Sequence, residues 1–304
     1  MKKTNYQNYR HIFFAIFIFF LTFLGFVQIG KTTSEKSNFA ELTVALLIGV
    51  IAYFLSNLLL QPEGEKGTKK KDNPVLQFES LSHPLLLKMS WLAPGTFHHA
   101  INVSILAQRA AEAIGADALL VRVAAYYHDL GKIGKPSLFI ENQSGEEIPR
   151  SEEGKEIKDT VAQIINHVDA GVLIATKNKM PGQIIDLIAE HHGTTKVIYF
   201  YEKAKEQGLA IKQTDFRYTG PAPQSREAAV LMLADSVEAA ARSVAVLTRS
   251  VIAQIVENTI KDKLGLNQFA QAGLRQNDLE MMKTALIEAL GSIYHQRIQT
   301  NEAN

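Results

Sequence analysis

The sequence predicts an all-α fold, and three observations support this prediction. Apolar residues recur at helical spacing along most of the chain after residue 75. No stretch alternates apolar and polar residues in the way that a half-buried strand does. Helix starts are signalled by Asp117 and Pro181, and helix ends by Gly208 and Gly265. A chain of 304 residues is therefore expected to hold one helical domain of about 220 residues together with additional N-terminal segments.

The first 60 residues differ in kind from the rest. Two uncharged apolar runs, 12–29 and 42–60, are each about long enough to cross a hydrocarbon core of roughly 30 Å. A signal peptide is the alternative for the first run, but no small-x-small cleavage site follows it. Lysines gather before the first run and after the second, so the positive-inside rule places both ends of a hairpin in the cytoplasm. Residues 1–60 are thus predicted to anchor the protein in the cell membrane.

A linker and a series of helices are predicted after this hairpin. Residues 61–74 are rich in Gly, Lys and Glu and are predicted to be a flexible linker. Residues 75–304 are predicted to form the main domain, on the cytoplasmic side of the membrane. Its first helical stretch, 76–91, is interrupted at Pro84. The remaining helices are expected at 97–114, 118–130, 156–177, 182–191, 195–207, 224–247, 250–264 and 277–298.

Composition limits the kind of site that this domain can hold. The chain has no cysteine, which excludes disulfides and thiolate ligands and fits a reducing compartment. The formal net charge is +1, and no basic face suggests duplex nucleic acid as a partner. A metal site would therefore use nitrogen and oxygen ligands.

Six of the nine histidines lie within one stretch of about 95 residues, singly or in pairs on successive apolar segments. These histidines are His98, His99, His128, His167, His191 and His192. Asp129 follows His128 directly, and Asp235 lies in a later apolar segment. A helical bundle can bring such side chains to one interior point, and imidazoles with carboxylates suit Fe or Mn. Five histidines and two aspartates would suit two metals that share a bridging carboxylate. The alternative is a set of unrelated buried or surface histidines.

The order His…His-Asp…His…His-His…Asp resembles that of the HD-domain metal phosphohydrolases. The surrounding sequence is most similar to the 7TM-receptor HD hydrolases, whose PgpH-type members are cyclic-di-AMP phosphodiesterases. The matching segments are 94–99 (PGTFHH), 122–132 (RVAAYYHDLGK), 139–143 (FIENQ), 191–195 (HHGTT), 216–223 (FRYTGPAP) and 233–242 (LADSVEAAAR). Members of that family typically carry a large extracytoplasmic domain and seven membrane spans, whereas this chain has at most two. A fragment, a reduced natural form and an engineered form all fit this difference.

The resemblance implies two divalent metals, Fe or Mn, held by seven residues. One metal would be bound by His99, His128, Asp129 and Asp235. The second would be bound by His167, His191, His192 and the bridging Asp129. Asp129 and Lys132 would be the catalytic residues, with Lys132 on a phosphate oxygen, where it stabilises charge in the transition state. The alternative for Lys132 is an ordinary surface lysine after a helix end.

Five further residues are expected to contact the substrate. They are Arg217, Tyr218, Arg242, Asn142 and His98. Arg and Tyr in a loop beside a metal site can contact phosphate and stack on a base. Arg242 lies seven residues after Asp235 and so shares its helix face. A purely structural role is the alternative for each of the five.

The implied activity is hydrolysis of cyclic-di-AMP to linear pApA. Enzymes of the HD-GYP type, which act on cyclic-di-GMP, would show Gly-Tyr-Pro after the His-His pair, and here Gly193, Thr194 and Thr195 follow. Two alternatives stay open: a phosphohydrolase of another nucleotide, such as cyclic-di-GMP or (p)ppGpp, and a cyclic-dinucleotide receptor without turnover. A receptor would be expected to lack a metal ligand, and none is lacking. Whether the chain forms a homodimer is left open.

Overall fold

The computed structural model describes residues 73–143 and 154–299, which belong to one compact unit, Asn73–Asn304. The hairpin predicted at 12–29 and 42–60 lies outside the described residues, so it stays a prediction. Among the helices that the structure describes, none combines the length and the apolar character needed to cross a membrane. Within 73–143 and 154–299 the only β-type pairing is an isolated antiparallel bridge between Lys196 and Arg217. The all-α prediction is therefore confirmed for this part of the chain.

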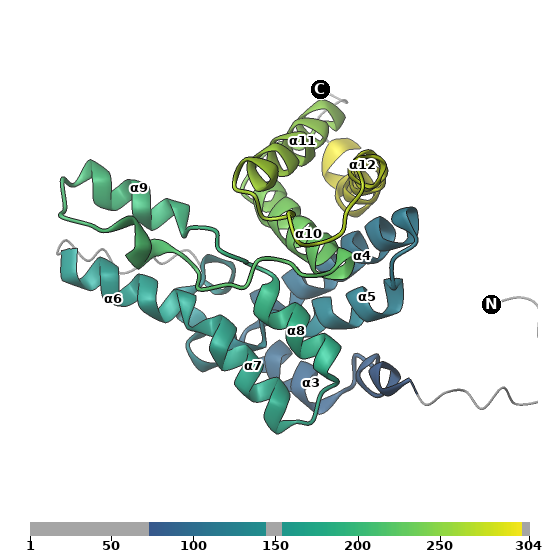
Figure 1. The fold of residues 1–304 in the computed structure, drawn as a ribbon, viewed down its shortest axis with the longest axis horizontal. Coiled ribbons are helices and arrows are strands. Elements are labelled where there is room, and N and C mark those ends of the chain that lie inside the picture. Colours follow the sequence, from purple (N-terminus) through teal and green to yellow (C-terminus); the bar gives the residue numbers. More distant parts are fainter. Residues whose placement is uncertain (1–72, 144–153, 300–304) are drawn as a thin grey trace, which may run out of the picture. The chain divides into compact units, whose positions relative to one another are not determined.

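Ten α-helices and five short 3-10 helices make up the described residues (Figure 1). The α-helices are α3 (Pro84–Leu92), α4 (Pro94–Ile114), α5 (Ala118–Tyr127), α6 (Gly154–Ile165), α7 (His167–Lys177), α8 (Gly182–Glu190), α9 (Ile198–Glu206), α10 (Arg226–Arg242), α11 (Arg249–Gly265) and α12 (Gln276–Gln299). The 3-10 helices are η1 (Pro74–Phe78), η2 (Leu130–Gly134), η3 (Pro136–Leu138), η4 (Ile140–Asn142) and η5 (Gln213–Phe216).

Helix α4 lies at the centre of the main core and packs against α3, α5, α10 and α12. Pro94 begins it at a position where a missing N–H costs nothing, and Gly115 ends it with a left-handed φ of 67°. Its buried face is rich in alanine, including Ala100, Ala107 and Ala111, which are fully buried. Small side chains let the neighbouring helices approach closely, so the backbone that carries the site is held in place on several sides.

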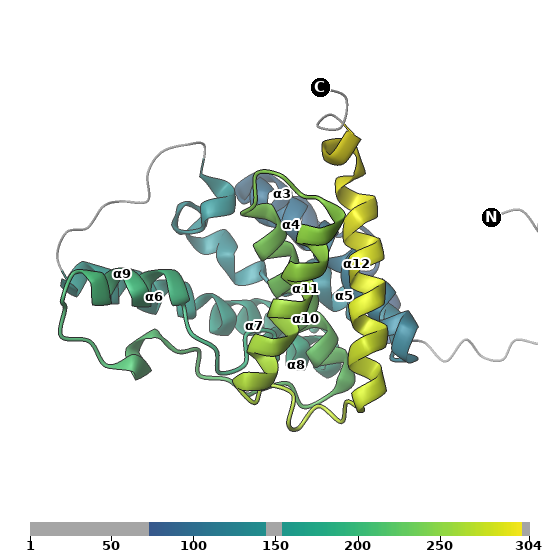
Figure 2. The same ribbon diagram turned by 90° about the horizontal axis from the view of Figure 1, so that it is seen from above.

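The buried apolar residues form two separate clusters. The larger one joins α3, α4, α5, α8, α10, α11 and α12. The smaller one lies where α6 and α9 run side by side, away from the other helices, in Figures 1 and 2. Phe139, Val161, Phe200 and Phe216 belong to this smaller cluster. This smaller cluster therefore anchors the loop before η4 and the loop after η5.

Several helix boundaries differ from the predicted ones for local reasons. The helix predicted at 156–177 is interrupted at Asn166, between α6 and α7. The ring of His167 bonds to the carbonyl of Ile164 there, and the new helix begins at His167 itself. The helix predicted at 118–130 ends at Tyr127 and continues as η2. At both places the helix is interrupted directly before a predicted metal ligand, His167 or His128.

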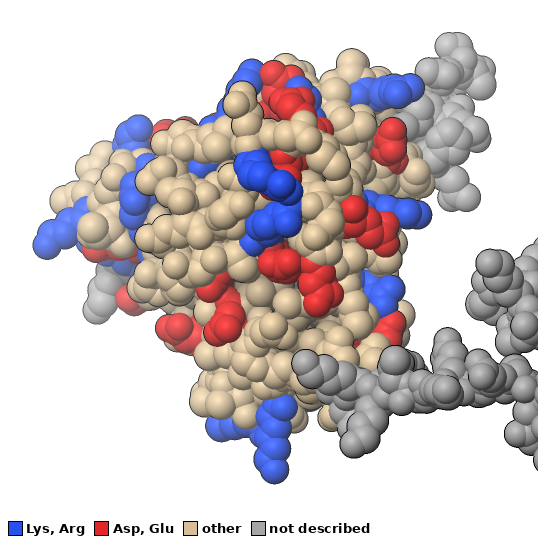
Figure 3. Space-filling view, turned by 45° about the vertical axis from the view of Figure 1, so that its right-hand side comes forward, with Lys and Arg blue, Asp and Glu red and all other residues tan. Residues whose placement is uncertain are grey.

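Acidic and basic side chains are interspersed on the face shown in Figure 3. No large surface of one sign appears on that face, which agrees with the near-zero net charge.

Candidate metal centre

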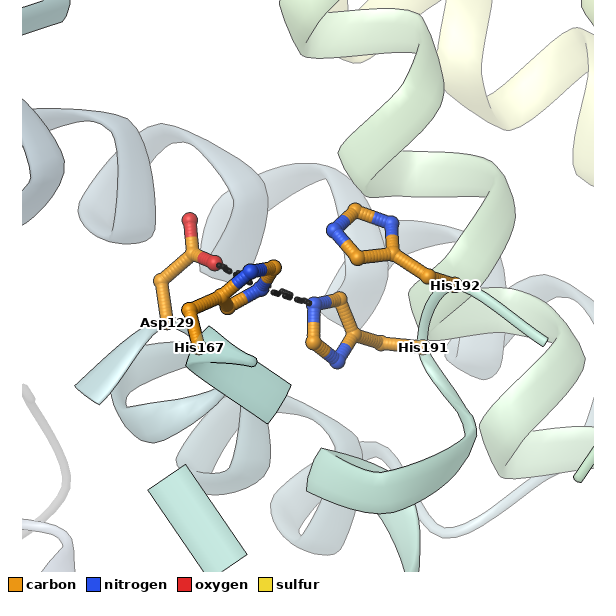
Figure 4. A group of neighbouring side chains, drawn as sticks. All are labelled: Asp129, His167, His191 and His192. Atoms are coloured by element: carbon orange, nitrogen blue, oxygen red, sulfur yellow. Dashed lines mark hydrogen bonds and ion pairs between the residues drawn. The ribbon is translucent and has the colours of Figure 1, made fainter. Parts of the chain in front are cut away.

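The seven predicted ligands converge on one buried point, although they come from five parts of the chain. His99 lies on α4, His128 and Asp129 follow α5, and His167 begins α7. The remaining three are His191 and His192 after α8, and Asp235 on α10. Six of the seven are buried, and His192 is partly buried. Figure 4 shows four of them, Asp129, His167, His191 and His192, turned toward one another from three different segments.

The side chains fall into two groups. Within each group, the ligand atoms all lie within 4.8 Å of one another. One group consists of His99, His128 and Asp235. The other consists of Asp129, His167, His191 and His192. Each group contains both imidazole and carboxylate, a donor set that suits Fe or Mn.

Asp129 lies between the two groups, with a different oxygen toward each. Its Oδ2 is 3.2 Å from Nε2 of His128 and 3.6 Å from Nε2 of His99. Its Oδ1 is 3.3 Å from Nε2 of His167 and 3.8 Å from Nε2 of His191. A carboxylate in this position can contribute one oxygen to each of two neighbouring cations.

Three of the imidazole rings are oriented by a backbone carbonyl in the last turn of the helix that precedes them. The Nδ1 atoms of His128, His167 and His191 bond to the carbonyls of Ala125, Ile164 and Ile188, at 2.8, 2.6 and 2.7 Å. A carbonyl accepts only, so each Nδ1 carries the proton and each Nε2 faces the centre. Nε2 of His167 and Nε2 of His191 are 3.3 Å apart. Two neutral rings of this tautomer would point lone pairs at each other there, which suits a shared cation.

The ring of His99 is oriented by a residue that sequence reasoning missed. Its Nδ1 bonds to Oε2 of Glu238, whose side chain is buried on α10, and its Nε2 lies 3.0 Å from Oδ1 of Asp235. Asn102 donates to the other oxygen of Glu238 at 3.2 Å. A carboxylate behind a metal-binding histidine fixes its tautomer and raises its basicity. The spacing of three residues from Asp235 to Glu238 was the available signal, because it places both on one helix face.

Burial and neighbouring charges shift the pKa values of several side chains in the two groups. Burial would raise the pKa of Asp129, but His128 and Lys132 beside it hold that pKa well below its usual range. Burial would lower the pKa of His128, but Asp129 and Asp235 raise it to about 10. Burial and the neighbouring His128 and His167 lower the pKa of His191 to about 3. Cation binding to the first group must therefore release protons, whereas His191 is already neutral.

Three buried polar atoms at the centre indicate whether a metal ion fits there. Nε2 of His128 and both carboxylate oxygens of Asp129 are buried and make no hydrogen bond within the described residues. Lys132 lies 2.7 Å from one of these oxygens as an ion pair, but outside hydrogen-bond geometry. Buried polar atoms without partners are costly and rare. Their common direction, toward the other imidazoles, fits a cation at this place.

Lys132 and Arg242 reach the same carboxylate at the edge of the centre. Nζ of Lys132 is 2.8 Å from Oε1 of Glu141, and Nη2 of Arg242 is 3.9 Å from Oε2 of Glu141. Lys132 is mostly buried, which excludes the alternative of an ordinary surface lysine. Glu141 lies in the segment 139–143 that carries the family resemblance, but its pairing with Lys132 and Arg242 was not predicted.

The other predicted substrate contacts lie in different surroundings. Tyr218 stacks on His192 with ring centroids 4.2 Å apart, which places it at the edge of the centre. Arg217 precedes it and is paired through its backbone with Lys196. Asn142 uses its amide to hold the backbone N–H and hydroxyl of Thr96, at 3.1 and 2.9 Å. His98 is exposed and turns away from His99 along α4.

Gly131 is a backbone contact on which the centre depends. A Cβ at this position would lie 1.9 Å from the carbonyl oxygen of His167 and 2.6 Å from the backbone nitrogen of Gly171. Because those atoms are backbone, Gly131→Ala must push η2 away from α7 and separate Asp129 from His167. We expect the melting temperature to fall, by a destabilisation of about 1–3 kcal/mol, with loss of metal from the second group.

Gly134→Ala is the matched control for this prediction. It lies at the end of the same η2, and nothing lies within 4 Å of its Cβ position. Calorimetry and elemental analysis of both variants make the comparison. Equal behaviour of the two would show that the close approach at Gly131 is not needed.

Comparison with known proteins identifies the family of the chain. The HD domain family model matches residues 96–240. The cyclic-di-AMP phosphodiesterase PgpH of Bacillus subtilis is 38% identical over 294 residues, which cover 95% of this chain and 41% of that protein. PgpH of Listeria monocytogenes is 41% identical over 225 residues, which cover 74% of this chain and 31% of that protein. The chain thus spans less than half the length of these relatives.

A solved structure is similar over the whole of its own length. The crystal structure of the HD domain of L. monocytogenes PgpH in complex with cyclic-di-AMP superposes with a TM-score of 0.66 and 42% identity. The match covers 71% of this chain and 100% of that domain. Because the fold and the sequence agree over a complete domain, the chain belongs to the HD-domain family, within the group of the PgpH proteins.

Proposed function

We propose that this protein is a membrane-anchored phosphodiesterase that hydrolyses cyclic-di-AMP to linear pApA at a two-metal centre facing the cytoplasm. The position of Asp129 carries this proposal, because its two oxygens face two different groups of ligands. The complex of the similar Listeria domain with cyclic-di-AMP supports the choice of substrate.

The ligands divide between the two metals as the geometry suggests. His99, His128 and Asp235 would hold one ion, and His167, His191 and His192 the other, with Asp129 bridging. Fe or Mn is the proposed metal, since imidazole and carboxylate suit both. When bound, two such ions would neutralise the charge of a phosphodiester and lower the pKa of a bound water toward neutral.

The remaining residues bind and orient the substrate. Lys132 and Arg242 present two cations from different elements at the edge of the centre, and each can attract an anionic phosphate. Tyr218, stacked on His192, offers a flat face beside the centre for a base. Arg217, Asn142 and His98 stay predictions as substrate contacts, and the hydrogen bonds of Asn142 to Thr96 favour a structural role for it.

The substrate proposal is tested by comparing two cyclic dinucleotides. The full chain, purified in detergent and loaded with Mn²⁺ or Fe²⁺, is expected to linearise cyclic-di-AMP faster than cyclic-di-GMP. The rates are measured by separating substrate and linear product chromatographically. Equal or reversed rates would refute the choice of substrate, and two bound metals with tight binding but no turnover would indicate a receptor.

The role of the N-terminal segment as a simple anchor is tested by removing it. Residues 73–304 include the whole compact unit, and the side chain of Asn73 caps η1 by accepting from the N–H of Val75. We therefore expect this fragment to keep the specific activity of the full chain in solution. An inactive fragment that is folded and metal-loaded would instead assign control of the site to residues 1–72.

A further inference from the structure

A buried carboxylate, Glu141, lies beside a centre that is proposed to bind an anionic phosphodiester. Only 5% of its side chain is exposed. A fixed negative charge at this place weakens phosphate binding, and burying it costs free energy. Another interaction of Glu141 in the site must therefore offset this cost in free energy.

The contacts of Glu141 point to Lys132. The ammonium group of Lys132 lies between two carboxylates, 2.7 Å from Oδ2 of Asp129 and 2.8 Å from Oε1 of Glu141. The second oxygen of Glu141 faces Arg242, and the hydroxyl of Thr96 donates to Oε1 at 3.2 Å. Glu141 thus offers the lysine a second partner of equal distance.

Lys132 on its own would oppose metal binding. Oδ2 of Asp129 is the oxygen that faces His99 and His128, so an ammonium group bound there competes with a metal in that group. Such competition is strong in a buried site, where charges are poorly screened. A second carboxylate on the far side of the ammonium group lets Asp129 give up this ion pair without leaving Lys132 unpaired.

We propose that Glu141 is a positioning residue that draws the ammonium group of Lys132 off Asp129, and so frees Asp129 to bridge two metal ions. This inference rests on the proposed two-metal function and adds to it the residue that keeps the bridging oxygen available. It also explains why Lys132 can face a substrate phosphate instead of remaining bound to a metal ligand.

The backbone holds Glu141 at this place with little freedom. A Cβ on Gly95 would lie 1.7 Å from the carbonyl oxygen of Glu141, so η4 lies directly on the first turn of α4. The amide of Asn142 bonds to both the N–H and the hydroxyl of Thr96, next along that turn. His99 follows on the same helix, which links the position of Glu141 to that of a metal ligand.

The inference is tested by a double-mutant cycle on the full chain, with Mn²⁺ alone as the probe. Electron paramagnetic resonance of free and bound Mn²⁺ gives the affinity without any turnover. Glu141→Gln is expected to weaken Mn²⁺ affinity about tenfold, in the range seen for residues that support metal ligands. In the Lys132→Ala background, the same substitution is expected to change the affinity less than twofold, because no ammonium group remains to be held.

The cycle separates positioning from a simple charge effect. If Glu141 acted only as a nearby negative charge, its loss would weaken Mn²⁺ binding equally in both backgrounds, and this result would overturn the inference. An unchanged affinity in the single variant would overturn it as well. Glu141→Asp keeps the negative charge but moves it away from Lys132, because the side chain is one methylene shorter. It is expected to give a smaller loss of Mn²⁺ affinity, which Lys132→Ala also relieves. It serves as the second variant if Glu141→Gln folds poorly.

A matched control is Glu112→Gln on α4, an exposed carboxylate that is paired with Arg109 and Gln108 at the surface. It is expected to leave Mn²⁺ affinity unchanged, and a loss equal to that of Glu141→Gln would overturn the inference. The cycle uses no nucleotide, so its outcome is independent of the substrate. Tight binding of two Mn²⁺ with the expected cycle, but no hydrolysis of cyclic-di-AMP, would refute only the proposed function.

Discussion

Asp129→Ala is expected to abolish metal binding at both groups and all hydrolysis with it. The two oxygens of Asp129 face different groups, each within 3.3 Å of an imidazole nitrogen, whereas the second oxygen of Asp235 is 3.7 Å from His192. Removing Asp129 is therefore expected to take a ligand from each metal. It also leaves the ammonium group of Lys132 and the ring of His128 without their nearest buried counter-charge. Removing one partner of a buried ion pair costs about 3–5 kcal/mol, so the variant should also unfold at lower temperature.

Elemental analysis and calorimetry check this expectation. Asp169→Ala is the matched control, since Asp169 is an exposed aspartate near the start of α7, two residues after His167. The control should keep both metals and the wild-type melting temperature. A full complement of metal in Asp129→Ala would contradict the bridging role.

Lys132→Ala is expected to keep both metals and to slow turnover by roughly 10²–10³, as the loss of a group that stabilises transition-state charge does. Lys132 is not a ligand at its usual protonation. Burial would lower the pKa of Lys132, but the carboxylates of Asp129 and Glu141 beside it raise that pKa above its ordinary value. Its ammonium group is therefore charged wherever the enzyme works. Turnover under saturating substrate, with metal content measured on the same sample, gives the comparison.

The control for this variant is Lys135→Ala. Lys135 is an exposed lysine three residues further on, and its partner is Gln163 on α6. It should leave turnover unchanged. If Lys132→Ala turned over at the wild-type rate, Lys132 would serve only to pair Asp129 with Glu141.

Several of the predicted ligands were accessible from the sequence because they form short, local patterns at helix ends. His128-Asp129 and His191-His192 stand where apolar helical segments finish, and the structure brings both pairs to one point. Asp117 was likewise identified as a helix start, and its side chain accepts from the N–H of Leu120. Local patterns of this kind survive folding unchanged.

Residues that act on a ligand from another element were not accessible in the same way. Glu238 supports His99 across 139 positions of sequence, and Glu141 meets Arg242 from a 3-10 turn whose place depends on tertiary packing. The break at Asn166 was hidden for a related reason. Apolar periodicity runs through it, and only the ring of His167, turned onto the carbonyl of Ile164, separates the two helices.

Three histidine rings bond to carbonyls in the last turn of the preceding helix, and this has a consequence for how the site can change. Each ring is aimed by an oxygen three residues earlier, and that oxygen belongs to the main chain. Any residue at 125, 164 or 188 supplies it, so side chains at these positions can vary without turning a ligand. Loops between the helices can likewise lengthen or shorten, provided that each helix end still arrives at the same place. The histidine rings are thus oriented locally, one helix end at a time. Asp129 can bridge the two groups only if these helix ends lie close together.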